Sequence, residues 1–93
     1  LKDLVNRITV RSHLVALTKD QTGSYIDSRM RCAGSNEKVF EVEAKGLIHD
    51  YASGIPRQIN NIATACLLNA AARNLQKINE SLVTGTMTEF HLP

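Results

Sequence analysis

The residues best placed to do chemistry lie in one stretch, 53–61, with the sequence SGIPRQINN. Gly54 can adopt a left-handed conformation that stops a helix, and Pro56 suits the first position of the next helix, where its missing N–H costs nothing. Arg57 then falls in the first turn, beside backbone N–H groups that have no partner in the helix. The helix dipole opposes a cation here, but free N–H groups and a guanidinium together favour a bound anion. The spacing indicates a helix corner with a candidate anion site; a plain corner with a solvated arginine is the alternative.

Two amides follow the arginine on the same helix. Asn60 and Asn61 lie three and four residues beyond Arg57, so they share its helix face. They are candidates for orienting the guanidinium or for contacting a ligand. Surface amides near a helix start are the alternative interpretation.

Cysteine and histidine supply a second set of reactive side chains: Cys32, Cys66, His13, His49 and His91. Metal ligands on helices usually come as close pairs, for example at i and i+4, and these residues do not. We therefore expect no metal site and no catalytic site from them. The two thiols are expected to be buried and to act as small apolar residues in a cytosolic chain. His49 is expected at the edge of the bundle.

The composition is that of one globular domain, or of a piece of a larger protein. The chain has 93 residues, 43% of them hydrophobic, and a net charge of +2, which by itself is too small to indicate nucleic-acid binding. No run of about 18 apolar residues is present, so no transmembrane helix is predicted. The opening residues contain neither a Met start nor a signal peptide, so we expect a segment from within a longer, cytoplasmic protein.

Capping signals and apolar periodicity predict the first two helices. The first begins at a capping box, with Thr18 as N-cap and Gln21 three residues on, and ends near 33 before Gly34. Its charged residues are expected on a solvated face: Asp27, Arg29 and Arg31. After a loop, residues 39–40 re-enter the core. The second helix spans about 42–53, with Ala44, Leu47, Ile48, Tyr51 and Ala52 on one apolar side.

Two further helices complete the predicted fold. The third begins at Pro56 and ends near Arg73, with Asn74 tolerant of the left-handed conformation. Its wide apolar face predicts a central position: Ile59, Ile62, Ala63, Cys66, Leu67, Ala70 and Ala71. The fourth is capped by Asn79 and runs to about Phe90, burying Leu82, Val83, Met87 and Phe90, with fraying or a bend predicted at 84–86.

The first 17 residues differ from the rest. Segments 8–10 and 13–17 are rich in β-branched and apolar residues, which favours a short strand or an extended arm. The predicted fold class is therefore all-α, a small four-helix bundle preceded by a short extended N-terminal arm.

The corner resembles the sensor 2 motif of AAA+ ATPases through Gly54-Ile55-Pro56-Arg57-x-Ile59-Asn60. It is most similar to the secretion-pathway ExeA type and to the related transposon-encoded helper ATPases. The likeness continues in order through Leu4-x-x-Arg7-Ile8, Leu14-x-x-Leu17-Thr18, Tyr25-Ile26-x-x-Arg29-Met30-x-x-Ala33-Gly34, Phe40-x-x-x-Ala44 and Ile48. A Gly-x-Pro-Arg motif is weak alone, whereas the ordered series is more specific and covers nearly the whole chain.

The resemblance implies a division of the chain into two parts. Residues 18–93 are similar to the helical lid of such an ATPase, and residues 1–17 to the end of its nucleotide-binding α/β core, including the last strand. The Walker A pattern Gly-x-x-x-x-Gly-Lys-Ser/Thr does not occur in this chain. The segment that holds Walker A and Walker B in such an ATPase is expected to precede Leu1. The chain alone is therefore not expected to hydrolyse ATP.

The resemblance also assigns roles to single residues. The core would hold ATP and Mg²⁺, and Arg57 would approach the γ-phosphate in the same subunit, aimed by Gly54 and Pro56. The two asparagines at 60 and 61 would assist it. Arg7 is similar in position to the arginine that some members insert into a neighbouring subunit, which implies a homo-oligomer; Arg11 competes for this role.

Two other functions stay open from the sequence. The second and third helices have the order of a helix-turn-helix, in which Arg57, Gln58 and the two asparagines would read DNA bases in a transposon-related protein. However, that third helix has no Lys or Arg between Arg57 and Arg73, which leaves few phosphate contacts. A bundle that serves only protein interactions is the other alternative. DNA or a transposase is a candidate partner of the longer protein.

Overall fold

The computed structural model describes residues 16–35 and 37–90, without the side chains of Glu37 and Phe90. Within these residues the chain forms four α-helices and no strand, which confirms the all-α prediction. The helices are α2 (Lys19–Cys32), α3 (Val42–Ala52), α4 (Pro56–Ala72) and α5 (Glu80–Phe90), with a short 3-10 helix η1 (Glu37–Val39) before α3. The predicted extended arm falls on residues 1–17, of which only 16 and 17 are described.

Helix α2 begins as its sequence predicts. The Thr18 hydroxyl accepts the backbone N–H of Gln21, and the Gln21 side chain accepts the backbone N–H of Thr18, so the capping box is complete. At the other end Gly34 has a φ of +75°, as expected for a left-handed helix stop. Asp27 is not on a freely solvated face, because the Lys45 ammonium of α3 lies 3.0 Å from its carboxylate and both side chains are half-buried. This ion pair joins α2 to α3.

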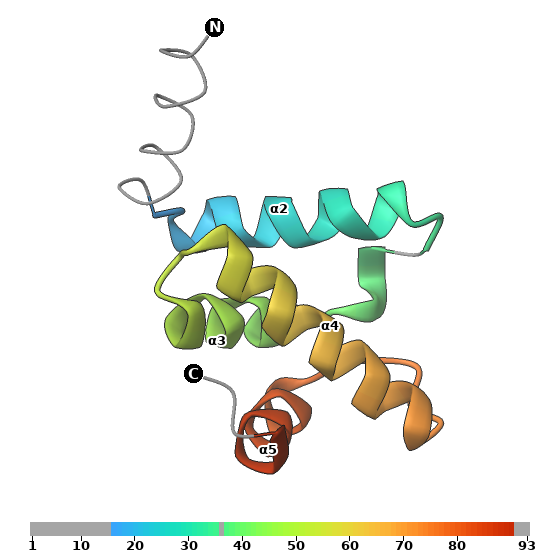
Figure 1. Cartoon of the computed structure of the whole chain (residues 1–93). Coiled ribbons are helices and arrows are strands. Elements are labelled where there is room, and N and C mark those ends of the chain that lie inside the picture. Colours follow the sequence, from blue (N-terminus) through green and yellow to red (C-terminus); the bar gives the residue numbers. More distant parts are fainter. Residues whose placement is uncertain (1–15, 36, 91–93) are drawn as a thin grey trace, which may run out of the picture.

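Helix α4 is the central element, as its apolar face predicts. It contacts α2, α3 and α5, and Figure 1 shows it running from the α2–α3 pair towards α5. The core that these helices enclose is built from Ile26, Met30, Phe40, Ala44, Ile48, Ala52, Ile59, Ile62, Cys66, Ala70, Ile78, Leu82, Val83 and Met87. Two residues predicted on apolar faces, Tyr51 and Ala71, are exposed instead. Periodicity places both near the border of an apolar stripe, where the position of the next helix decides burial.

The loops before α3 and α5 are joined by an isolated parallel β-bridge between Phe40 and Ile78. The Ile78 N–H donates to the Val39 carbonyl at 2.8 Å, and the Glu41 N–H donates to the Ile78 carbonyl at 3.0 Å. Phe40 and Ile78 are both buried. The burial of Phe40 was predicted, whereas Ile78 lies outside any predicted helix and has no local periodicity that would place it in the core.

Helix α5 is capped by Asn79, whose side-chain oxygen accepts the Leu82 N–H at 2.9 Å, as predicted. The helix runs unbroken through 84–86, where we expected fraying or a bend. Thr86 is fully buried, and its hydroxyl donates to the Leu82 carbonyl one turn earlier at 2.7 Å. This bond supplies the partner that a buried hydroxyl needs, so the poor helix propensity of threonine does not open the helix. The predicted burial of the Phe90 side chain lies outside the described residues.

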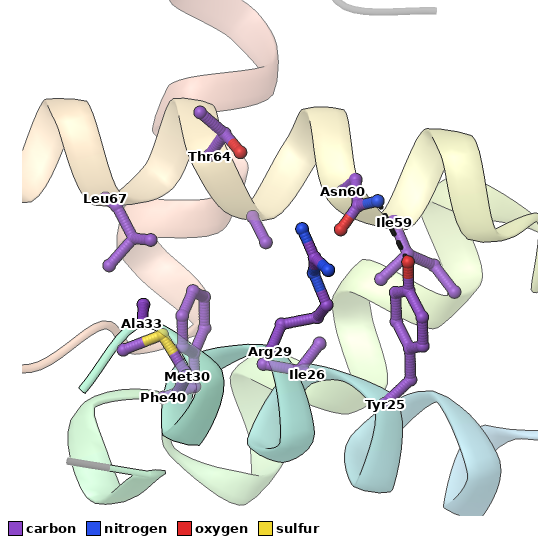
Figure 2. Close-up of a pocket in the computed structure, with 11 residues that line it drawn as sticks. Tyr25, Ile26, Arg29, Met30, Ala33, Phe40, Ile59, Asn60, Thr64 and Leu67 are labelled. Carbon is purple, nitrogen blue, oxygen red and sulfur yellow. Dashed lines mark hydrogen bonds between the residues drawn. The ribbon is translucent and has the colours of Figure 1, made fainter. Parts of the chain in front are cut away.

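A polar contact fixes α2 against α4. The Asn60 side chain donates to the Tyr25 hydroxyl at 2.9 Å, and both side chains lie at one end of a cleft between the two helices (Figure 2).

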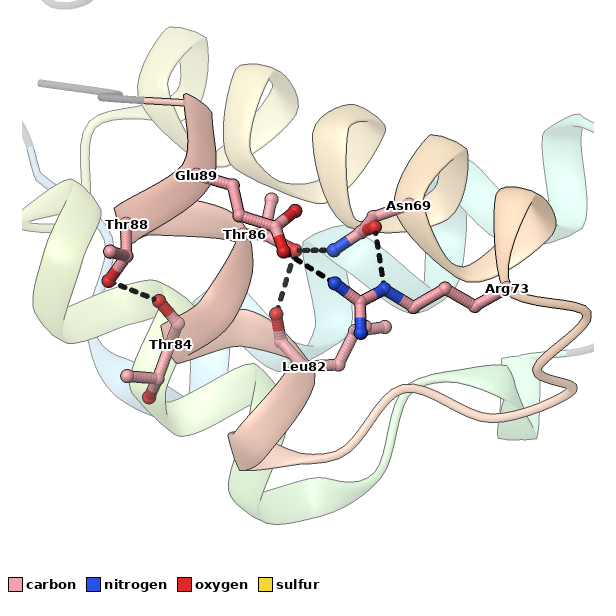
Figure 3. A network of polar contacts seen from close by, with 7 residues as sticks. All are labelled: Asn69, Arg73, Leu82, Thr84, Thr86, Thr88 and Glu89. Carbon is pink, nitrogen blue, oxygen red and sulfur yellow. Dashed lines mark hydrogen bonds and ion pairs between the residues drawn. The ribbon is translucent and has the colours of Figure 1, made fainter.

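A second polar network joins α4 to α5 (Figure 3). Asn69, buried on α4, donates to the Thr86 hydroxyl at 2.9 Å and accepts from Arg73 Nε at 3.1 Å. Arg73 also forms an ion pair with Glu89 of α5. The network fixes the C-terminal half of α4 on α5 with every member bonded.

Candidate functional site

The corner between α3 and α4 has the backbone geometry that its sequence predicts. Helix α3 ends at Ala52, and Ser53 and Gly54 follow in the left-handed region, with φ values of +55° and +75°. Ile55 is extended, and Pro56 begins α4. The left-handed conformation of Gly54 and the helix start at Pro56 are confirmed; the left-handed Ser53 was not expected.

The segment that leads into α2 lies directly on this corner. The Leu17 N–H donates to the Gly54 carbonyl at 2.8 Å. A Cβ atom at Gly54 would overlap the Leu17 carbonyl oxygen and lie 2.9 Å from its amide nitrogen. Glycine is therefore required twice here, by the backbone conformation and by the close approach of another segment. The first reason can be read from the sequence, whereas the second depends on a contact between residues that are 37 positions apart.

Arg57 lies in the first turn of α4 with an exposed side chain. It makes no hydrogen bond or ion pair with any residue that the structure describes. The N-cap residue, Ile55, offers no side-chain cap, and the first turn contains no acidic residue. The start of α4 thus presents an available cation together with backbone N–H groups that no side chain caps, which is an arrangement suited to an anion.

The two asparagines that follow Arg57, Asn60 and Asn61, differ in their surroundings. Asn60 is half-buried and is bonded to Tyr25 of α2, so its amide nitrogen is already engaged within the bundle. Asn61 is exposed. Of the pair, Asn61 has the freer side chain, and Asn60 holds the helix that carries Arg57.

His49 contributes a contact that sequence reasoning missed. It lies at the edge of the bundle, half-buried, as expected, with Nε2 3.0 Å from the Leu17 carbonyl. Because a carbonyl only accepts, Nε2 carries the hydrogen in this contact. The same segment is therefore bonded to both α3 and the corner, through the two backbone groups of one residue. No sequence pattern predicts the contact between His49 and Leu17, since a lone histidine in an amphipathic helix has no recognisable partner.

The other ring nitrogen of His49 faces Asp50. Nδ1 lies 3.4 Å from a carboxylate oxygen of Asp50, and the Lys19 ammonium lies 3.3 Å from the same oxygen. Hydrogen bonds from His49, in the form in which both ring nitrogens carry a hydrogen, and from Lys19 lower the pKa of the Asp50 carboxyl from its usual value. The carboxylate therefore stays ionised beside the corner.

The two cysteines occupy different environments. Cys66 is buried in α4, and burial raises the pKa of its thiol to about 11, so it is protonated at neutral pH. Cys32, the last residue of α2, is exposed, so the prediction of a buried thiol is wrong there. Among the described residues, no three His, Cys, Asp or Glu side chains are grouped so that they could hold a metal ion.

Several predicted residues lie outside the described part of the chain. Arg7, the candidate for insertion into a neighbouring subunit, is one of them, and so is its competitor Arg11. The histidines at 13 and 91 are others. None of the helices that the structure describes is long and apolar enough to span a membrane.

The chain is similar to General secretion pathway protein A of Aeromonas hydrophila, with 37% identity over 78 residues. The matched region is 84% of this chain but 14% of that protein, so the chain corresponds to a small part of its relative. No protein-family profile matches the chain. No solved structure matches it either.

Proposed function

We propose that residues 18–93 are the helical lid of an AAA+ ATPase of the secretion-pathway ExeA type, or of the related transposon-encoded helper ATPases. Two findings support this. The sequence similarity is to a general secretion pathway protein, and the described residues form a four-helix unit in which the sensor 2-like motif falls at a helix corner. In this proposal residues 1–17 are the end of the α/β core that holds ATP and Mg²⁺.

The observation that carries the proposal is the state of Arg57. It is exposed, it has no partner in the described chain, and its helix start is uncapped by any side chain. An arginine bonded to a carboxylate inside the bundle would not be available to a nucleotide. In the longer protein Arg57 would bind the γ-phosphate, because its fork of N–H donors matches phosphate oxygens and stabilises the charge of the transferring phosphoryl group.

The contacts of Leu17 suggest how the lid would sense the core. In the proposal this residue joins the core to the lid, and its two backbone groups are bonded to Gly54 and His49. A shift of the core strand would therefore reach the corner directly, without passing through α2. Hydrolysis removes the γ-phosphate and with it the Arg57 contact, which frees the lid to rotate.

Further roles belong to the longer protein. Arg7 is proposed to act in a neighbouring subunit of a homo-oligomer, and DNA or a transposase to be a partner if the longer protein serves transposition. An Arg7→Ala variant should then lose oligomer-dependent hydrolysis while Arg11→Ala does not.

The test compares ATP hydrolysis and nucleotide binding in the longer protein that carries this chain. We expect Arg57→Ala to lower kcat by at least about tenfold and to reduce the preference for ATP over ADP, since a preorganised donor to the transition-state charge is lost. Lys77→Ala is the matched control, because it removes one exposed positive charge from the loop before α5. It should leave both measurements unchanged.

Wild-type hydrolysis and wild-type discrimination between ATP and ADP in Arg57→Ala would contradict the proposal. A gel shift of DNA by the 93-residue chain that weakens with salt and with Arg57→Ala would favour the helix-turn-helix alternative. The circular dichroism spectrum and urea midpoint of each variant show whether the bundle is intact.

A further inference from the structure

A cleft lies between α2 and α4, beyond the corner and separate from the exposed face of Arg57. Its volume is about 180 Å³, and it is bounded by Tyr25, Arg29, Ala33, Asn60, Thr64 and Leu67 (Figure 2). We call it the α2–α4 cleft.

The inner wall of the α2–α4 cleft is apolar. Ile26, Met30 and Phe40 line it from one side and Ile59 from the other, and all four belong to the buried core. Because these side chains also pack on one another, the wall is held in place by the core. An apolar group that enters the cleft would contact the partly buried Tyr25, Ala63 and Leu67, which also line it and pack on this core. The surface is therefore preformed, which lowers the cost of binding.

Arg29 is the one charged residue among those lining the cleft. Figure 2 shows its guanidinium extending from α2 towards α4, between Asn60 and Thr64. It makes no hydrogen bond or ion pair with any residue that the structure describes. At the nearby end of the cleft, the Asn60 amide nitrogen donates to the Tyr25 hydroxyl. Among the described residues, the only charge in the cleft is thus the Arg29 guanidinium, with the neutral polar groups of Tyr25, Asn60 and Thr64 around it.

The size of the cleft limits what it can hold. Sites for cofactors and drug-sized ligands occupy roughly 300–1,000 Å³. At about 180 Å³ the α2–α4 cleft is too small for a nucleotide, but large enough for one bulky apolar side chain. Interfaces between proteins often anchor one such side chain in a pocket and surround it with polar contacts.

We propose that the α2–α4 cleft is a docking site for a partner protein that inserts one large apolar side chain and pairs an adjacent carboxylate with Arg29. The charge of Arg29 selects an acidic segment, and the volume selects a single anchor residue. This surface is distinct from the Arg57 corner, so the inference does not depend on the ATPase proposal.

Peptide binding to the 93-residue chain tests the proposal, followed by the backbone amide signals of α2 and α4 in an NMR titration. The probe is a blocked five-residue peptide with phenylalanine between two aspartates. Two control peptides replace the aspartates with lysines or the phenylalanine with alanine. We expect the acidic phenylalanine peptide to shift the signals of the cleft residues and to bind at least about tenfold more tightly than either control, with an affinity that falls as salt is added.

Three variants locate the binding. Arg29→Gln should remove the preference for the acidic peptide over the lysine peptide, and Ala63→Leu, which fills the cleft, should abolish binding of both. Lys77→Gln, with the same loss of charge outside the cleft, should bind like wild type. Well-dispersed spectra of each variant show that it is folded.

Other outcomes overturn the proposal. Equal binding of the acidic and lysine peptides, or shifts confined to residues outside the cleft, would reject it. Binding of free 3-phenylpropionate to the cleft without binding of the acidic peptide would also reject it, because the cleft would then accept a small carboxylate but not a polypeptide.

Discussion

Helix α4 has an arginine at each end, and the two differ in almost every respect. Arg57, in the first turn, is exposed and has no partner in the described chain. Arg73, at the C-cap, donates to the Asn69 side chain and forms an ion pair with Glu89. The helix dipole favours a cation at the second position and opposes one at the first.

The two arginines therefore differ in role: Arg73 contributes to the stability of the fold, whereas Arg57 is available to a ligand. At its C-terminal end α4 is fixed on α5 by a network that includes a buried amide and a buried hydroxyl, so the arginine there contributes to the fold. At its N-terminal end the backbone is fixed tightly, by Gly54 and Leu17, while the side chain of Arg57 is left unbound. A rigid backbone beneath a free cation suits a ligand-binding arginine, because the backbone then loses little conformational freedom on binding.

The largest effect on stability is expected from a substitution that disturbs the backbone at the N-terminal end of α4. Gly54→Ala places a Cβ atom against the Leu17 carbonyl and imposes a left-handed conformation on alanine. We expect the free energy of unfolding to fall by about 3 kcal/mol, from the conformational strain together with the loss of the Leu17 hydrogen bond. Urea unfolding followed by circular dichroism measures it.

Gly34→Ala is the matched control for that change. Gly34 has the same φ of +75°, but nothing lies within 4 Å of the position that its Cβ would take. Its variant should lose only the strain energy, about 1 kcal/mol. Equal losses for both glycines would show that the approach of Leu17 adds nothing to the stability of the corner.

The next largest effect on stability is expected from a substitution in the polar network at the C-terminal end of α4. Asn69→Ala removes the partner of both Thr86 and Arg73 and leaves a buried hydroxyl with one bond fewer. We expect a loss of about 2 kcal/mol in the free energy of unfolding. Asn61→Ala, at an exposed position on the same helix, should change it by less than about 0.5 kcal/mol. A similar loss in the two variants would remove the contrast between the ends of α4.

The smallest effects on stability are expected when each of the two arginines is replaced by alanine, which compares them directly. Arg73→Ala should lower the free energy of unfolding by about 1 kcal/mol, since its ion pair with Glu89 is partly exposed and favoured by the dipole. Arg57→Ala should leave stability unchanged or raise it by about 0.3 kcal/mol, because a cation is removed from a helix N-terminus. Urea midpoints at low and high salt measure both, and both differences should shrink as salt is added. A loss in Arg57→Ala as large as that in Arg73→Ala would mean that the first arginine has a structural role.

Much of the fold is predictable because the signals for it are local. The capping box at Thr18, the helix stop at Gly34, proline at the start of α4 and the Asn79 cap each fix a boundary within a few residues of themselves. The structure places the helix ends within one residue of those predicted. Local sequence also gives the exposed arginine its place in the first turn of α4.

What the sequence could not predict depends on contacts between distant segments. The engagement of Asn60 by Tyr25 separates it from Asn61, although both share a helix face with Arg57. The approach of Leu17 to the corner and the ion pair of Asp27 with α3 have the same origin. Periodicity gives the direction in which a side chain points along its own helix, but the position of the neighbouring helix decides what it meets.

The bridge between Phe40 and Ile78 has a consequence for the order in which the chain folds. Its two bonded segments are separated in sequence by all of α3 and α4, so the packing of those helices brings them together and lowers the entropic cost of closing the loop between them. Helices α2, α3 and α4 follow one another closely and can assemble through short loop closures. We expect α5 to join last, with Ile78 entering a nucleus that the other three helices have already formed.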